Sequence, residues 1–126
     1  DRFGDIPDMT RRDLQDEAKE RRRPWEAGKS FDASAPTGPL RPASMTGHPH
    51  DRRIWLSVND DVRQDSNTSL LRWDIAESIA ILSRYFALEA GDLIYSGTPA
   101  GVGLVDRGDV IRGGVDGVDE IEVRVI

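Results

Sequence analysis

The sequence of 126 residues contains no cysteine, only two histidines and only two lysines, Lys19 and Lys29. Without cysteine there is neither a disulfide framework nor a thiolate-ligated metal site, so a metal ion must be held by oxygen ligands or by the two histidines. No apolar stretch approaches the ~18 residues that a membrane-spanning helix needs, and the first residues lack a secretory signal pattern. We therefore expect a soluble, cytoplasmic protein with no membrane partner.

Apolar content and charge are those of an ordinary globular domain. The side chains are 37% hydrophobic, and with 12 glycines the apolar share is that of a chain that builds a core. The net charge is −6, and residues 60–126 hold 13 acidic against 6 basic groups. Because this half repels a phosphate backbone, and the one basic cluster, at 19–23, lies among acids, we expect no nucleic-acid partner.

Local patterns predict a series of short helices and strands. Thr10 with Asp13 three positions later resembles a helix start, and Asp74 with Glu77 repeats the pattern. The predicted helices are 10–23 and 74–87, and the predicted strands are a hairpin at 53–65 with its turn at 59–60, then 91–96, 109–112 and 119–126. The intervening residues 24–49, with five prolines, are predicted to form a long loop. This order of elements indicates an α+β fold dominated by sheet.

Three polar side chains gather near the start of the first predicted helix. Asp8, Arg12 and Gln15 are spaced to lie on one side of its first two turns, so that a carboxylate, a guanidinium and an amide can converge on one small ligand. An oxyacid chelated by a carboxylate-held divalent cation suits this trio. The alternative is an acid that favours the helix dipole beside ordinary surface residues, and the spacing leaves both interpretations open.

Lys29 stands between Gly28 and Ser30 in the proline-rich predicted loop. A lysine in such a rigid segment can be aimed at a developing enolate or at a carboxylate. The alternative is an exposed loop lysine. Because lysine is rare in this arginine-rich chain, a role that needs a compact ammonium group is worth testing.

The segment 97–103 combines three glycines with the hydroxyl of Thr98, directly after a predicted strand. Such a turn presents backbone N–H groups and a hydroxyl to an anion. It is not a Walker loop, since no Gly-Lys-Ser/Thr closes it, and no helix pattern follows as a dinucleotide fingerprint requires. A tight crossover that needs positive φ angles explains the glycines equally well.

Two other groups of metal-ligand residue types are weaker candidates. His48 and His50 flank a proline in the predicted loop, where histidines are usually exposed rather than bound to metal. Glu120 and Glu122 share one face of the last predicted strand, a spacing that can hold a cation. We favour the solvated edge of a terminal strand for this pair.

Four segments together resemble the fumarylacetoacetate hydrolase family, and they are most similar to its fumarylpyruvate hydrolase and acylpyruvase branch. They are residues 8–15, 24–32, 58–64 and 91–103. The resemblance covers nearly the whole chain from Asp8 onward in the family's order and spacing, and the segment 91–103 is specific by itself. It implies an α+β fold with a mixed β-sheet roll and short helices, assembled as a homodimer.

The resemblance also implies an enzyme of aromatic-compound breakdown. Family members cleave a carbon–carbon bond in 2,4-diketo acids, acylpyruvates such as fumarylpyruvate, to give pyruvate and a carboxylic acid. A Mg²⁺ or Mn²⁺ ion chelates the carboxylate and 2-oxo group of the substrate, and the cation and a lysine stabilise the departing enolate. The alternative is an activity like that of the relatives that act as 2-hydroxymuconate-type isomerases or oxaloacetate decarboxylases.

The family's functional residues match the side chains already singled out. Asp8 matches the metal-binding aspartate, and Lys29 matches the catalytic lysine that contacts the substrate and stabilises the enolate. Arg12 and Gln15 match side chains that reach the substrate, and Thr98 matches the threonine that binds a substrate carboxylate.

Two departures from the family pattern concern the start of the chain. The family's other metal ligands, a Glu-X-Glu pair, and its water-activating residues lie upstream of the aspartate, whereas seven residues precede Asp8 here. Pro7 stands where the family runs an apolar strand into the aspartate. The resemblance therefore implies that residues 1–126 are one domain, the C-terminal portion of a family catalytic domain lacking its usual N-terminal part. We expect either a hydrolase whose N-terminal part is not included, or a shortened, inactive member that only binds small 2-oxo acids.

Overall fold

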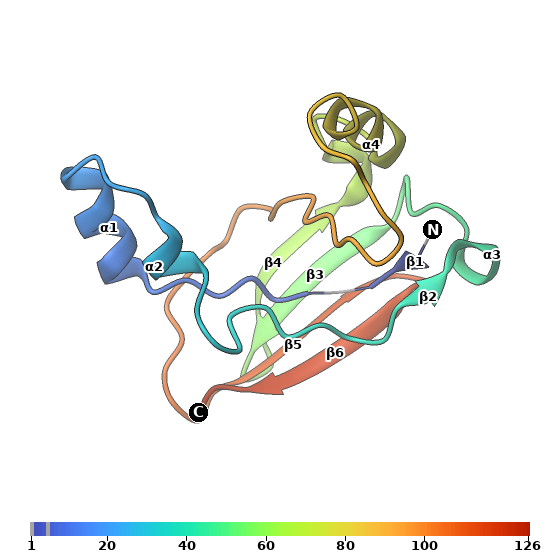
Figure 1. The fold of residues 1–126 in the computed structure, drawn as a ribbon. Helices are drawn as coiled ribbons and strands as arrows, with labels where there is room; N and C mark the ends of the chain where they lie inside the picture. The colour runs from blue at the N-terminus through green and yellow to red at the C-terminus, as the bar shows by residue number, and fades with distance from the viewer. Residues whose placement is uncertain (1, 5) are drawn as a thin grey trace.

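The computed structural model describes residues 2–4 and 6–126, and its centre is a four-stranded antiparallel sheet (Figure 1). Its strands, in the order β4-β3-β5-β6, are β3 (Arg53–Val58), β4 (Asp61–Asn67), β5 (Val110–Val115) and β6 (Asp119–Arg124). A second sheet pairs the short strands β1 (Arg2–Phe3) and β2 (Arg41–Pro42). Short helices complete the chain, so the predicted α+β class is confirmed.

The predicted hairpin is confirmed as β3 and β4. Its turn residues Asn59 and Asp60 both have positive φ angles, 50° and 69°, which suit the twist of a two-residue hairpin turn. The side chain of Asn59 also ties this turn to the start of β5, because its Nδ2 donates to Asp109 Oδ1 at 2.7 Å and its Oδ1 accepts from the backbone N–H of Val110 at 2.9 Å. The last two predicted strands are confirmed as β5 and β6.

The two faces of this sheet differ in chemistry. Val58 and Ile111 lie opposite each other on one face, and at 5% and 3% exposure they are the buried hydrophobic residues of the part of the chain that the structure describes. The other face carries ion pairs between strands, such as Arg112 Nε to Glu122 Oε2 at 2.7 Å. The small core therefore lies on the apolar face.

The first helix is shorter than predicted, and Thr10 is not its cap. Helix α1 spans Arg12–Glu20, its N-cap residue is Arg11, and no side chain caps it. The Thr10 hydroxyl instead accepts a hydrogen bond from Lys29 Nζ at 3.0 Å, so it binds the lysine side chain and does not cap the helix.

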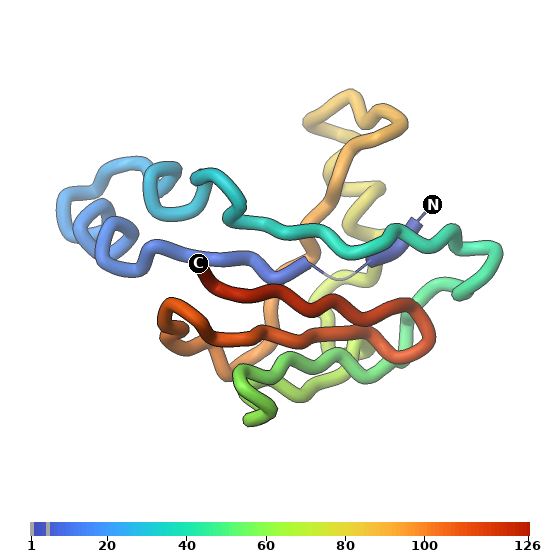
Figure 2. The backbone as a smooth tube through the Cα atoms, turned by 90° about the horizontal axis from the view of Figure 1, so that it is seen from below, coloured from blue at the N-terminus to red at the C-terminus, as the bar shows by residue number. Residues whose placement is uncertain are grey.

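The segment predicted to be one long loop contains short regular elements. These are α2 (Glu26–Lys29), β2 and α3 (Ala43–Thr46). Proline lacks the N–H that a longer helix or a central strand requires, which limits their length. Residues 6–11 and 31–42 run side by side in opposite directions between the α1–α2 pair and the β1–β2 pair (Figure 2). The backbone N–H of Met9 donates to Ser34 O at 2.8 Å within this pair of segments.

The capping pattern at Asp74 is confirmed. The Asp74 side chain accepts from the Glu77 N–H at 2.7 Å, and the Glu77 carboxylate accepts from the Asp74 N–H at 2.9 Å, which forms a complete capping box. The helix that follows, α4 (Ile75–Leu82), ends earlier than predicted and is preceded by the 3₁₀ turn η1 (Thr68–Leu70). No described helix has the length and apolar character that crossing a membrane requires.

The prediction of a strand at 91–96 is wrong. These residues lie in irregular chain after α4 (Figure 1), and Ile94 and Tyr95 are 40% and 48% exposed. A short apolar segment becomes a strand only when another strand satisfies its backbone N–H and C=O groups, and none of the described strands pairs with it. We call residues 83–104 the apolar arm, because it exposes Tyr85, Phe86, Leu88, Leu93, Ile94, Tyr95, Val102 and Leu104.

Candidate functional site

A glycine brings the two N-terminal helices into contact. A Cβ atom on Gly28 would lie 3.0 Å from the backbone nitrogen of Gln15 and 3.2 Å from Arg11 O, so that even alanine would push the two helices apart by a few tenths of an ångström. The backbone N–H of Arg11 donates to Gly28 O at 2.9 Å. Because α2 approaches the start of α1 this closely, its last residue, Lys29, is placed next to the segment that leads into α1.

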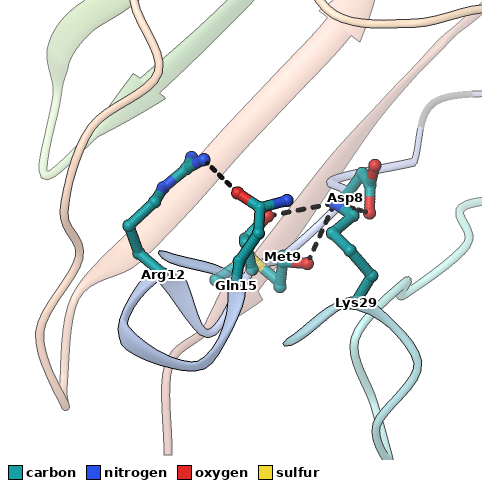
Figure 3. Close-up of polar contacts among 6 residues, drawn as sticks. Asp8, Met9, Arg12, Gln15 and Lys29 are labelled. Carbon is teal, nitrogen blue, oxygen red and sulfur yellow. Dashed lines mark hydrogen bonds and ion pairs between the residues drawn. The ribbon is translucent and has the colours of Figure 1, made fainter. Parts of the chain in front are cut away.

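The ammonium group of Lys29 is held by three acceptors from that segment. Its Nζ lies 2.7 Å from Asp8 Oδ1, 3.0 Å from Thr10 Oγ1 and 3.3 Å from Met9 O (Figure 3). The Lys29 side chain is 30% exposed and the Asp8 side chain 46%, so both groups remain accessible to a small ligand. Lys29 is therefore not a freely exposed loop lysine but part of an ordered polar cluster.

Arg12 and Gln15 form the second pair of this cluster. Arg12 Nη1 donates to Gln15 Oε1 at 2.8 Å (Figure 3). Gln15 is only 6% exposed, whereas Arg12 is exposed. Asp8 lies before α1 rather than on it, so the three residues do not share a helix face as the spacing predicts. The contact between α2 and α1 at Gly28 instead brings Lys29, and with it Asp8, close to the start of the helix that carries Arg12 and Gln15.

Thr98 belongs to a different cluster, which links the apolar arm to β4. Gln64, 8% exposed, donates from Nε2 to Thr98 Oγ1 at 2.9 Å and to Pro99 O at 2.8 Å. Gly101 then passes so close to β4 that a Cβ on it would collide with Arg63 O. Within residues 2–4 and 6–126, no hydrogen bond or ion pair joins Thr98 to the cluster around Lys29.

The weaker metal candidates stay unsupported. Among the described residues, no group of three histidines or carboxylates is arranged to hold a metal ion. Glu120 and Glu122 are exposed on the edge strand β6, as expected for a solvated edge. Glu122 is paired with Arg112, and this contact, with help from Asp60, raises the pKa of the Arg112 guanidinium.

Sequence reasoning missed Gln64 and Thr10 as partners of the predicted site residues. Gln64 lies opposite Leu56, on the face of the sheet that also carries Val58. A polar side chain at an inward position of a predicted strand was the available signal, because buried amides need hydrogen-bond partners. Thr10 gave no separate signal, since its helix-capping pattern explained it.

The sequence of this chain is similar to a known family and to several of its members. The model of the fumarylacetoacetate hydrolase C-terminal domain matches residues 6–126. Fumarylpyruvate hydrolase of a Ralstonia species is 45% identical over 119 residues, which are 94% of this chain and 61% of that protein. A mitochondrial oxaloacetate tautomerase of Rattus norvegicus is 43% identical over 118 residues, 94% of this chain and 53% of that protein.

Solved structures agree with these relatives. Fumarylpyruvate hydrolase from Pseudomonas aeruginosa, in complex with Mn²⁺ and pyruvate, superimposes with a TM-score of 0.95 at 50% identity, covering 99% of this chain and 54% of that one. The chain thus spans about half the length of several relatives that it matches. With its family model matched over nearly every residue, this chain belongs to the fumarylacetoacetate hydrolase family.

Proposed function

We propose that this chain serves an enzyme that hydrolyses a carbon–carbon bond in an acylpyruvate, with a divalent cation as cofactor and pyruvate as one product. The observation that supports this proposal most is the ion pair between Asp8 and Lys29, which puts one candidate cation ligand and one candidate enolate-stabilising ammonium 2.7 Å apart. The Pseudomonas relative with Mn²⁺ and pyruvate supports the choice of cation and product.

Asp8 has the donor type that a hard divalent cation prefers. Mg²⁺ is commonly held by one or two carboxylates, with water and substrate oxygens in its other positions, and the Asp8 carboxylate fits as one such ligand. The bound cation supplies a Lewis acid that polarises the 2-oxo group of the substrate. Asp8 then has a dual role, because the same carboxylate also orients Lys29.

Lys29 is placed to stabilise negative charge. After water adds to the distal carbonyl, the carbon–carbon bond breaks and its electron pair goes to the pyruvate enolate, which takes up a proton on carbon. The three N–H donors of the ammonium group contact Asp8, Thr10 and Met9, and exchange of the longest contact, 3.3 Å to Met9 O, for the enolate oxygen would lower the energy of this step. Asp8 and Thr10 hold the other two donors, so that the group is oriented before the substrate arrives.

Arg12, Gln15 and Thr98 are the proposed binding groups for the rest of the substrate. A guanidinium forms strong, directed hydrogen bonds to a carboxylate, and Arg12 is both exposed and fixed by Gln15. The Thr98 hydroxyl can bind a second carboxylate of the substrate or the carboxylate of its 2-oxo acid group. The proposed ligand is thus a small 2-oxo acid.

The proposed assembly is a homodimer, which light scattering tests.

A second candidate function is tautomerisation of oxaloacetate. It is favoured by the rat relative, whose name states that activity and whose identity to this chain is close to that of the fumarylpyruvate hydrolase. In that reaction a proton would move between the carbon next to the carbonyl and the carbonyl oxygen, and the same lysine would stabilise the enolate formed between the two transfers. No water would be added and no carbon–carbon bond would break.

The decisive experiment replaces each of the two lysines in turn. We expect Lys29→Met to lower Mg²⁺-dependent pyruvate release from fumarylpyruvate by about 100-fold or more, as loss of an oxyanion donor does. The matched control is Lys19→Met, which removes an exposed lysine that contacts its helix neighbour Asp16 and the Trp25 ring and should leave the rate unchanged. An unchanged rate in Lys29→Met contradicts the assigned role, and wild-type activity on oxaloacetate alone favours the tautomerase.

Asp8 is tested by metal binding rather than by rate. Titration calorimetry with Mn²⁺ should show weaker binding by Asp8→Ala than by wild type, because a carboxylate ligand is lost. Asp13→Ala, which removes an exposed acid of α1, is the control for overall charge. Equal Mn²⁺ affinities in all three proteins show that Asp8 is not a ligand.

A further inference from the structure

Gln64 is a buried polar residue whose side chain serves a segment far away in the sequence. It lies in β4 at 8% exposure, and its side-chain nitrogen donates to residues 98 and 99 of the apolar arm. Buried amides are costly unless they are hydrogen-bonded, so these contacts fix the position of both partners. Gln64 is thus the side chain that attaches Thr98 to the sheet.

The chemistry of Pro99 fixes which way the Gln64 amide faces. A backbone carbonyl only accepts hydrogen bonds, so the group 2.8 Å from Pro99 O must be the amide nitrogen and not the amide oxygen. The same nitrogen lies 2.9 Å from Thr98 Oγ1 and therefore donates to it. The Thr98 hydroxyl accepts from Gln64, and its own hydrogen has to point elsewhere.

This direction matters for an anionic ligand. A hydroxyl carries one hydrogen and two lone pairs. Thr98 uses one of its lone pairs to accept the hydrogen bond from Gln64. Its hydrogen remains available to donate to a carboxylate at the exposed side of residue 98. An acceptor in place of the Gln64 nitrogen would attract that hydrogen and turn the lone pairs toward the ligand.

We propose that Gln64 is a positioning residue for substrate binding: by donating to Thr98 it sets the threonine hydroxyl as a hydrogen-bond donor toward the carboxylate of a small 2-oxo acid. This inference rests on the proposed function, in which Thr98 binds the substrate. The close approach of residue 101 to β4, where a Cβ on Gly101 would lie 3.3 Å from Gln64 Cγ, keeps Thr98 within reach of the Gln64 amide.

The sharpest test is Gln64→Glu, which keeps the shape of the side chain but reverses the hydrogen bond. In titration calorimetry of pyruvate with Mn²⁺ present, we expect this variant to bind pyruvate about tenfold more weakly, or worse, with unchanged Mn²⁺ affinity. Gln64→Met, which removes the donors without adding an acceptor, should show a smaller loss. Val62→Glu adds the same charge at an exposed position of β4 and should bind pyruvate like wild type.

A pH series separates positioning from a merely structural role. Protonation of the carboxyl that Gln64→Glu introduces restores an O–H donor to Thr98, so the pyruvate Kd ratio of variant to wild type should fall as the pH is lowered. In a Thr98→Val background the Gln64→Glu substitution should have almost no further effect on pyruvate binding, because the hydroxyl through which it acts is gone. A pH-independent ratio, or full additivity of the two substitutions, overturns the inference.

The outcomes also distinguish this inference from the function on which it rests. If Thr98→Val weakens pyruvate binding while Gln64→Glu does not, the role of Gln64 is wrong and the proposed function stands. If neither wild type nor any variant binds pyruvate with Mn²⁺, the proposed function fails, and the inference fails with it.

Discussion

The four-stranded sheet and the apolar arm are both rich in large apolar side chains, yet they reach different structural states. In the sheet, each strand of β4-β3-β5-β6 has a hydrogen-bonded neighbour, and Ile111 is 3% exposed. In the arm, Ile94 is 40% exposed and no described strand pairs with its backbone. Apolar side chains alone therefore do not produce a packed element, because the backbone also needs a partner.

The arm is nevertheless attached firmly to the sheet. Gln64 holds residues 98 and 99, and Gly101 approaches the backbone of Arg63. Before that attachment, the residues that line an open surface hollow of about 510 Å³ beside α4 are almost all apolar. We therefore expect the loss in the free energy of unfolding to depend on where a substitution lies, in the sheet, at the attachment or along the arm. The type of residue replaced should matter less.

The largest expected effect is Ile111→Ala. Removing a buried isoleucine leaves a cavity and should lower the free energy of unfolding by about 3 kcal/mol. The matched substitution Ile94→Ala, in the arm, should cost less than about 1 kcal/mol, because its side chain is already in contact with solvent. Urea denaturation of the two variants measures both values. Equal costs would mean that the arm is packed in solution, and the comparison would fail.

The attachment is tested by Gly101→Ala, with Gly91→Ala as its control. Both glycines have positive φ angles, 103° and 108°, so alanine is strained at either position. At Gly101 the new Cβ would also collide with Arg63 O, whereas at Gly91 nothing lies within 4 Å. We expect Gly101→Ala to lose about 2 kcal/mol of stability or more, and Gly91→Ala about 1 kcal/mol. A similar loss in both would show that the close approach to β4 does not stabilise the protein.

The sequence predicted those elements whose signals are local. The turn at Asn59 and Asp60 and the capping box of Asp74 and Glu77 each depend on residues within a few positions of one another, and both formed as predicted. The strand at 91–96 failed because its existence depends on a partner strand, which no local pattern can supply.

The candidate site shows the same limit. Family resemblance picked out Asp8 and Lys29, and their contact depends on the close packing of Gly28 against α1, which spacing along the chain does not reveal. Gln64 was missed for the same reason, since its partner Thr98 is 34 positions away. Residue chemistry was predictable from the sequence, but which distant side chains meet was not.

The smallest expected effect concerns acid pH at the sheet. Asp109 accepts from the backbone N–H of Asp106 and from Asn59, and these hydrogen bonds lower the pKa of its carboxyl below the ordinary 3.8. A carboxyl with a lowered pKa in the folded state stabilises the fold above the ordinary value, and this stabilisation is lost as the pH falls through the lowered pKa.

Asp109→Asn removes this contribution at every pH, because an amide does not titrate in this range. The free energy of unfolding of wild type should therefore exceed that of the variant at about pH 6, and the difference should shrink at about pH 3 and below. Urea unfolding at the two pH values measures the effect. If the Asp109→Asn difference stays constant, the hydrogen bonds at Asp109 do not favour its ionised form, and the acid sensitivity of the sheet must come from another carboxyl.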